Sequence, residues 1–182
     1  MKNHNPKNRS KPETGFPPVA DANSRVLVLG SMPGIMSLER RQYYAQPRNA
    51  FWPIMGELFG IAHDLDYAER LQGLLDAGVA LWDVLRSCER SGSLDTNIDM
   101  KTAISNDFAG FFPVHSRIDR VFFNGATAAR VFARRVSPEL QAAGGGSIEL
   151  IRLPSTSPAH AAMPYQEKLR RWSVVERAIC AS

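Results

Sequence analysis

The sequence predicts an α/β fold, a three-layer α/β/α sandwich with a central four-stranded parallel sheet. Four short apolar runs are spaced along the chain, and helical patterns separate them. Strands that alternate with helices pair in parallel through right-handed crossovers. The runs are apolar enough to be buried on both faces, as strands of such a sheet are. The expected strands cover residues 25–29, 79–84, 121–125 and 147–153.

The helices are expected from apolar spacing and from end signals. Gly60 closes the first helix and Asp66 caps the second, while the last carries Leu169, Trp172 and Val175 on one face. A helix near residue 106 should stop before Pro113, because proline disfavours the helical conformation in the residue before it. The expected helices cover residues 50–59, 66–78, 106–112, 126–136 and 165–181.

Length and composition indicate one globular domain, over residues 23–182, preceded by a disordered basic arm over residues 1–22. The net charge of +4 suits a polyanionic partner without requiring one. The two cysteines and four histidines show no metal-ligand spacing, so we expect no metal and no other cofactor. There is neither a signal peptide nor a run of ~18 apolar residues, which indicates a cytoplasmic protein without a membrane partner. We expect a monomer.

An aromatic segment, residues 43–52, follows the first strand and its exit turn. It reads Tyr-Tyr-Ala-Gln-Pro-Arg-Asn-Ala-Phe-Trp, and open α/β sheets bind ligands beyond the carboxyl ends of their strands. Aromatic faces with a carboxamide between them can grip a flat, hydrogen-bonding ring. This segment therefore predicts a pocket for one nucleobase.

Polar or turn-forming residues also follow the other strands. Asp83 ends the second, Asn124-Gly125 ends the third, and a serine-rich turn at residues 154–158 follows the fourth. Because parallel strand exits converge at one sheet edge, these groups should form a single cleft. Hydroxyls and backbone amides in the serine-rich turn could hold a phosphate.

Three motifs in this order resemble the uracil-DNA glycosylase superfamily, and most closely its hypoxanthine-DNA (deoxyinosine) glycosylase branch. They are Gly30-Ser31-Met32-Pro33-Gly34, the aromatic segment 43–52, and Leu153-Pro154-Ser155-Thr156-Ser157-Pro158-Ala159. The resemblance runs from about Arg25 to Trp172.

Two positions depart from the polar catalysts of the superfamily. Met32 stands where mismatch-specific relatives carry an asparagine that positions water, and Leu153 stands where uracil-specific relatives carry a histidine. The resemblance implies that Asn49 takes over catalysis, that Phe51 stacks on the flipped base and that Asp83 reads its edge. The expected base pocket comprises Ser31, Met32, Pro33, Gly34, Tyr44, Phe51 and Asp83, and the expected DNA-backbone contacts are Arg48, Ser155, Thr156 and Ser157.

The implied reaction is hydrolysis of the N-glycosidic bond of a deaminated base in double-stranded DNA, chiefly hypoxanthine and secondarily uracil, during base excision repair. Such a protein would be nucleoid-associated in a prokaryote. The carboxamide of Asn49 would orient water or donate to the leaving base. Two alternatives stay open. One is a damaged-base sensor with weak catalysis, and the other is a small-molecule nucleoside hydrolase.

Overall fold

The computed structural model describes residues 12–142 and 148–180, and these form two sheets and seven α-helices. The larger sheet is parallel, with the strand order β3-β2-β6-β7. Its strands are β2 (Val26–Gly30), β3 (Val79–Asp83), β6 (Arg120–Asn124) and β7 (Glu149–Leu153). The four expected strands and the α/β class are confirmed, although β7 begins two residues later than predicted.

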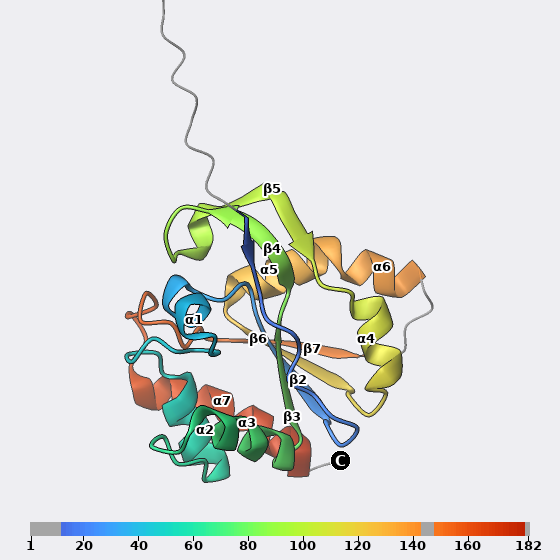
Figure 1. The fold of residues 1–182 in the computed structure, drawn as a ribbon. Coiled ribbons are helices and arrows are strands. Elements are labelled where there is room, and N and C mark those ends of the chain that lie inside the picture. Colours follow the sequence, from blue (N-terminus) through green and yellow to red (C-terminus); the bar gives the residue numbers. More distant parts are fainter. Residues whose placement is uncertain (1–11, 143–147, 181–182) are drawn as a thin grey trace, which may run out of the picture.

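Helices cover both faces of this sheet (Figure 1). Val26 and Val28 face a cluster with α2, α3 and α7, whereas Leu27 and Leu29 face the side covered by α4 and α5. The alternation explains why the run is apolar throughout, since both faces of the strand are buried. The helices are α1 (Ile35–Arg40), α2 (Phe51–Phe59), α3 (Tyr67–Asp76), α4 (Phe108–Val114), α5 (Ala126–Arg135), α6 (Ser137–Ala142) and α7 (Tyr165–Cys180).

The predicted boundary of α4 is wrong at both ends. Asp107 caps the helix by accepting a hydrogen bond from the backbone N–H of Gly110 at 2.8 Å, so the helix begins at Phe108 instead of residue 106. Pro113 lies inside the helix. Pro113 lies in the last turn of the helix. Because proline has no backbone N–H, one helical hydrogen bond is lost there, and only Val114 follows before the helix ends.

A second, three-stranded antiparallel sheet was not predicted. It has the order β1-β4-β5 and consists of β1 (Glu13–Thr14), β4 (Leu85–Arg90) and β5 (Ile98–Ser105), with a 3-10 turn at Asp95–Asn97. Figure 1 shows this sheet beyond the carboxyl end of β3, next to α1 and α5. Strand β4 follows β3 after one residue. The β4–β5 hairpin therefore begins at the carboxyl end of β3, the edge of the parallel sheet where the site was expected.

The N-terminal segment contacts both sheets, and the prediction of a disordered arm is therefore wrong for residues 12–22. Glu13 pairs with Cys88 in β4, and Val19 forms an antiparallel bridge with Leu81. The indole N–H of Trp82 donates to the Phe16 carbonyl at 3.0 Å, which fixes the segment across the sheet. Residues 1–11 of the predicted arm and the expected glycine turn at 144–146 lie outside the described residues.

Candidate active site

The connections of the parallel sheet reverse direction between β2 and β6. From β2 the chain crosses to β3 on one side, and from β6 it crosses to β7 on the other. Open α/β sheets bind ligands outside the carboxyl ends of their strands at such a reversal. Gly30 and Asp83 are register partners at this edge, as are Asn124 and Leu153. The expected convergence of strand exits is therefore present.

Asp83 is a buried carboxyl group with an unused oxygen. The residue is 3% exposed, and Oδ2 has no hydrogen-bond partner within residues 12–142 and 148–180. Gly30 makes this placement possible, because a Cβ at that position would lie 2.3 Å from Asp83 Oδ1. Burial raises the pKa of Asp83 to about 8, with a further contribution from Asp95 that the Arg90 guanidinium partly offsets. The group is consequently a neutral carboxylic acid at pH 7.

Tyr44 covers the aromatic residue that was expected to stack on a base. Phe51 is fully buried, and the Tyr44 ring lies on it with 4.0 Å between centroids and 27° between planes. The Tyr44 hydroxyl is buried near Asp83 and Asn124, and within the described residues it makes no hydrogen bond of normal geometry. The backbone of Tyr44 is left-handed, with φ of 55°, which is uncommon for a bulky residue. In this structure Tyr44 thus occupies the space beside Phe51.

Asn49 is held by a turn of its own. Its Oδ1 accepts a hydrogen bond from the backbone N–H of Phe51 at 3.0 Å, and its own N–H donates to the Gln46 carbonyl at 2.8 Å. The side-chain oxygen is thereby engaged at the start of α2. The side-chain NH₂ makes no hydrogen bond to the described part of the chain, so Asn49 has hydrogen-bond donors to offer.

Asn124 and Thr156 clamp the loops of the site together. Asn124 Nδ2 donates to Thr156 Oγ1 at 2.8 Å, and the Thr156 N–H donates to Asn124 Oδ1 at 2.8 Å. The Thr156 carbonyl accepts from the Ala50 N–H at 3.0 Å, which links the serine-rich turn to the residue after Asn49. Thr156 is 1% exposed and its hydroxyl is bonded to Asn124, so in this structure the side chain is not presented to a phosphate and the residue holds the Asn49 loop.

The other predicted phosphate contacts are more open. Arg48 is exposed, and Ser155 and Ser157 are half-buried. Each serine hydroxyl accepts a hydrogen bond from the backbone N–H two residues later, at 3.2 Å in both cases, and each O–H can still donate. These three residues remain available to a phosphate.

The first motif lies against the core, with most of its side chains buried. Ser31, Met32 and Pro33 are buried, and Gly34 precedes the first residue of α1. Met32 belongs to one core cluster and Leu153 to the other. The two positions that carry polar catalysts in relatives therefore serve packing here.

Sequence reasoning missed the role of Asn124 and the group around Asp95. Asn124 was expected at the end of its strand but was given no role. The signal in the sequence was a carboxamide directly after the apolar run of the strand. Asp95 accepts a hydrogen bond from the Ser31 hydroxyl at 2.7 Å across 64 residues of sequence. A local sequence pattern does not predict a hydrogen bond between residues so far apart in the sequence.

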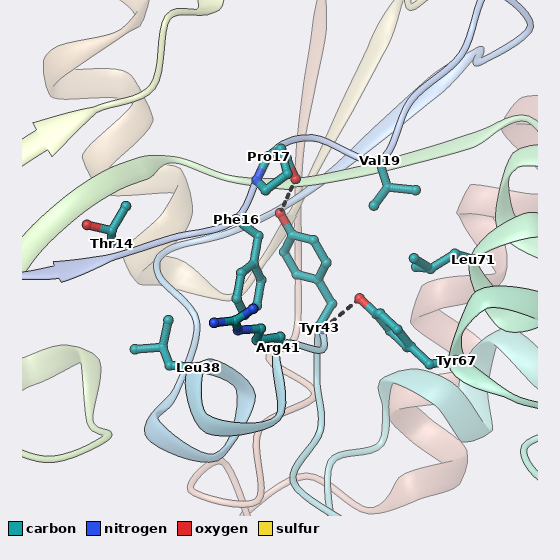
Figure 2. Close-up of a pocket in the computed structure, with 9 residues that line it drawn as sticks. All are labelled: Thr14, Phe16, Pro17, Val19, Leu38, Arg41, Tyr43, Tyr67 and Leu71. Carbon is teal, nitrogen blue, oxygen red and sulfur yellow. Dashed lines mark hydrogen bonds between the residues drawn. The ribbon is translucent and has the colours of Figure 1, made fainter.

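An open hollow of about 520 Å³ lies apart from these groups, between the N-terminal segment, α1 and α3 (Figure 2). In this hollow the Tyr43 hydroxyl donates to the Pro17 carbonyl at 3.2 Å, and the Tyr67 hydroxyl accepts from the Tyr43 N–H at 2.9 Å. The lining residues are Thr14, Phe16, Pro17, Val19, Leu38, Arg41, Tyr43, Tyr67 and Leu71.

The class of protein is thus an α/β protein with a four-stranded parallel sheet, and polar side chains gather at the carboxyl ends of its strands, where this class of fold binds ligands. The family model of the uracil DNA glycosylase superfamily matches residues 17–176. This chain belongs to that superfamily, and it is a DNA glycosylase, an enzyme that hydrolyses N-glycosidic bonds. Within residues 12–142 and 148–180, no helix combines the length and apolarity needed to cross a membrane.

Individual relatives agree with this assignment. The chain is 38% identical over 112 residues to a protein of Methanosarcina barkeri named hypoxanthine DNA glycosylase, and the match covers 61% of this chain and 70% of that protein. A protein of the same name from Methanosarcina acetivorans is 36% identical over 115 residues, which is 63% of this chain and 72% of its own length. The solution structure of a candidate uracil DNA glycosylase from Methanosarcina acetivorans superimposes with a TM-score of 0.76 at 32% identity, covering 93% of this chain and 99% of the other.

Proposed function

We propose that this glycosylase removes hypoxanthine from deoxyinosine in double-stranded DNA, by hydrolysis and without cutting the strand. The observation that carries the proposal is the buried, unpaired carboxyl group of Asp83 beside stacked aromatic rings. The names of the Methanosarcina relatives support hypoxanthine as the substrate. Uracil also presents an N–H donor next to a carbonyl acceptor, so we propose it as a secondary substrate of this enzyme.

Asp83 suits the edge that deamination creates. Hypoxanthine presents an N1–H donor next to an O6 acceptor. A neutral carboxylic acid can accept from N1–H through its carbonyl oxygen and donate its O–H to O6, which makes two hydrogen bonds at once. Because the pKa of Asp83 is raised to about 8, this neutral form is the one present at pH 7. The base would thereby satisfy the oxygen of Asp83 that has no partner in the free protein.

Asn49 assists departure of the base in this proposal. Its Oδ1 is bound to the Phe51 N–H, and its NH₂ remains as a donor. Cleavage of the N-glycosidic bond places negative charge on the leaving purine, and donors directed at developing charge lower the barrier. The geometry of Asn49 thus favours stabilisation of the leaving base over proton removal from water.

Entry of the base requires Tyr44 to move. A base that stacks on Phe51 needs the face that the Tyr44 ring now covers. The unpaired hydroxyl and the left-handed backbone of Tyr44 both make its present position less favourable, and this lowers the cost of displacement. Flipping the base out of the DNA duplex costs a few kcal/mol, and this cost is lowest at a mispair.

The DNA backbone is held by Arg48, Ser155 and Ser157 in this scheme, while Thr156 keeps their loops in register. Double-stranded DNA containing a deaminated base is the proposed partner of one protein molecule acting as a monomer. We place the enzyme in the cytoplasm, on the nucleoid in a prokaryote. Cys88 and Cys180 are free thiols, which supports a reducing compartment.

The direct test is single-turnover incubation with a duplex carrying one deoxyinosine, followed by alkali. A deoxyuridine duplex and free inosine run in parallel as competing substrate classes, and Asn49→Ala runs beside the wild type. We expect cleavage at inosine, weaker cleavage at uracil, no turnover of the free nucleoside and loss of cleavage in the variant. Lesion-selective binding without an abasic product would instead favour a sensor, and a borohydride-trapped adduct would refute the monofunctional mechanism.

A further inference from the structure

Asp95 lies in the 3-10 turn of the β4–β5 hairpin and is held next to Ser31, the residue that follows β2. It was not among the predicted site residues. Asp95 Oδ2 accepts a hydrogen bond from the buried Ser31 hydroxyl at 2.7 Å. Its other oxygen makes no hydrogen bond within the described chain and is absent from the fully buried unpaired atoms, so this oxygen of a half-buried residue keeps some contact with solvent. The carboxylate is therefore oriented through one oxygen and free at the other.

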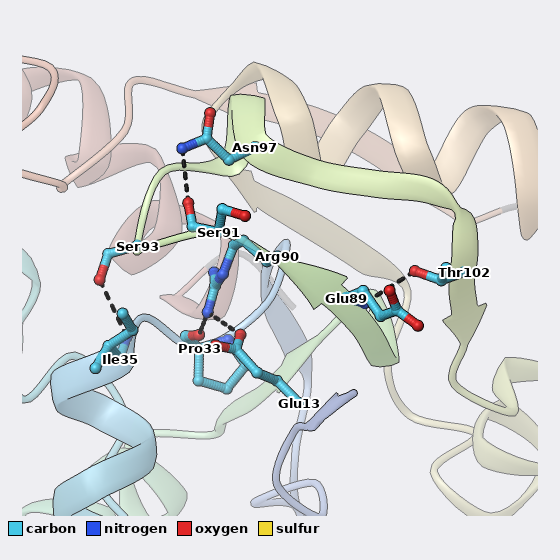
Figure 3. Close-up of polar contacts among 9 residues, drawn as sticks. All are labelled: Glu13, Pro33, Ile35, Glu89, Arg90, Ser91, Ser93, Asn97 and Thr102. Carbon is cyan, nitrogen blue, oxygen red and sulfur yellow. Dashed lines mark hydrogen bonds and ion pairs between the residues drawn. The ribbon is translucent and has the colours of Figure 1, made fainter. Parts of the chain in front are cut away.

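The hairpin that carries Asp95 is fastened to the first motif (Figure 3). The Arg90 guanidinium donates to the Pro33 carbonyl and to Glu13, both at 2.6 Å. Ser93 Oγ accepts from the Ile35 N–H at 3.3 Å, on the other side of Gly34. These bonds hold the hairpin tip against the Ser31–Ile35 turn, so Asp95 has a defined place beside the strand exits.

Charged groups from three elements surround this carboxylate. Asp83 from β3 is near enough to be affected by its charge, and Arg90 from β4 and Arg130 from α5 face it with positive charge. Burial raises the pKa of Asp95, while the Ser31 hydrogen bond and the two arginines act in the opposite direction. Ser31 directly follows β2 and Arg130 belongs to α5, the helix after β6, so Asp95 has neighbours from both sides of the point where the sheet connections reverse.

The reaction needs a proton acceptor that the groups described so far do not supply. Hydrolysis consumes a water molecule whose proton must be taken up as its oxygen bonds to the sugar. Met32 and Leu153 are apolar and buried, the amide of Asn49 is not a base, and Asp83 is a neutral acid engaged with the base in the proposed scheme. A carboxylate with one anchored and one open oxygen has the form that general-base catalysis requires.

We propose that Asp95 is the general base of this enzyme, an inference that rests on the proposed glycosylase function. The open oxygen of Asp95 binds the attacking water and takes one of its protons as the water oxygen bonds to C1′. The C1′–N9 bond breaks with its electron pair going to N9 of hypoxanthine. The proton on Asp95 then returns to solvent and the purine takes up a proton, so that the products are an abasic sugar and free hypoxanthine.

Asp95→Asn separates this role from a structural one. The amide oxygen can still accept the Ser31 O–H, but the group cannot take up a proton. We expect single-turnover excision from the deoxyinosine duplex to fall by about 100-fold or more, with unchanged thermal stability and lesion binding. The acid limb of the wild-type pH–rate profile, which reports protonation of the base, should disappear. Asp99→Asn removes an equal charge from an exposed position of the same hairpin and should leave excision unchanged.

Chemical rescue provides an independent readout. In Asp95→Ala, added formate should restore part of the lost excision rate, because a small carboxylate can occupy the vacated space. Excision by Asp95→Asn within threefold of the wild type would overturn the proposal while leaving the glycosylase function intact, and so would failure of formate to rescue a folded Asp95→Ala. No excision by the wild type on any deaminated base would overturn the proposed function, and this inference with it.

Discussion

Replacing Asp83 by Asn should stabilise the protein, by an amount that grows with pH. In the unfolded chain the carboxyl has its ordinary pKa of 3.8, whereas in the folded chain burial holds it at about 8. Between these values the folded state keeps a proton that the unfolded state has lost, so wild-type stability falls as pH rises through this window. The side-chain amide of asparagine does not titrate, and the variant escapes this loss.

The size of the effect follows from the same two values. Each pH unit above 3.8 costs the wild type ~1.4 kcal/mol until the pH approaches 8. The predicted advantage of Asp83→Asn is therefore about 1.5 kcal/mol at pH 5 and about 4 kcal/mol at pH 7, as an upper bound. Groups that titrate equally in both proteins cancel in this difference. The unpaired O–H of the acid and the unpaired NH₂ of the amide also contribute similar, pH-independent costs.

Urea unfolding of both proteins at pH 5, 6, 7 and 8, followed by far-ultraviolet circular dichroism, measures this difference directly. A difference in unfolding free energy that stays constant from pH 5 to pH 8 would refute a buried neutral Asp83. A wild type that is the more stable protein at pH 7 would show that the carboxylate is ionised and paired. The same ionisation should slow wild-type excision above pH 8, because a carboxylate repels O6, and the variant should lack this decline.

Four further substitutions test the other parts of the site. Asn49→Asp keeps the acceptor for the Phe51 N–H but loses the donor, so single-turnover excision should fall about 100-fold, as in Asn49→Ala; near-normal activity would mean that Asn49 acts as an acceptor. Tyr44→Phe removes a buried unpaired hydroxyl and should raise the unfolding free energy by about 1 kcal/mol, where a decrease would reveal a hydrogen bond. Arg48→Ala should reduce the slope of log affinity against log salt for duplex binding by about 0.9, and an unchanged slope would exclude a phosphate contact. Asn124→Ala breaks both bonds to Thr156 and should cost about 2 kcal/mol in urea unfolding together with slower excision, whereas unaffected excision would dissociate the clamp from catalysis.

The parallel sheet was predictable because each strand carries its own signal. Val26 to Leu29 and Val121 to Phe123 are apolar at every position, as strands buried on both faces must be. The β4–β5 hairpin carries no such signal. Exposed residues such as Arg86 and Asp99 interrupt its buried positions, and one face of a small edge sheet needs few apolar side chains.

The site also contains residues that local sequence predicts and contacts that it does not. Asp83 was predicted from its place at a strand end, and the structure puts it at the carboxyl end of β3, opposite Gly30 of β2. The inward orientation of Thr156 could not be predicted, because it depends on Asn124 32 residues away in the sequence. The same holds for the Ser31–Asp95 bond. Contacts of that range are set by tertiary packing, which neither motif spacing nor local propensity encodes.

The pairing of Glu13 with Arg90 also has a consequence for the order of events during synthesis. The two residues are 77 positions apart, so at about 5–20 residues per second the N-terminal segment waits about 4–15 seconds for its partner strand. During that interval β1 has no neighbour, and the hairpin that will carry Asp95 does not yet exist. The first described segment to emerge therefore docks only once β3 and β4 have been made, before β5, β6 and β7 exist. Asp95 lies beyond β4 in the sequence, so the Ser31 hydroxyl at the exit of β2 gains its carboxylate partner only after that step.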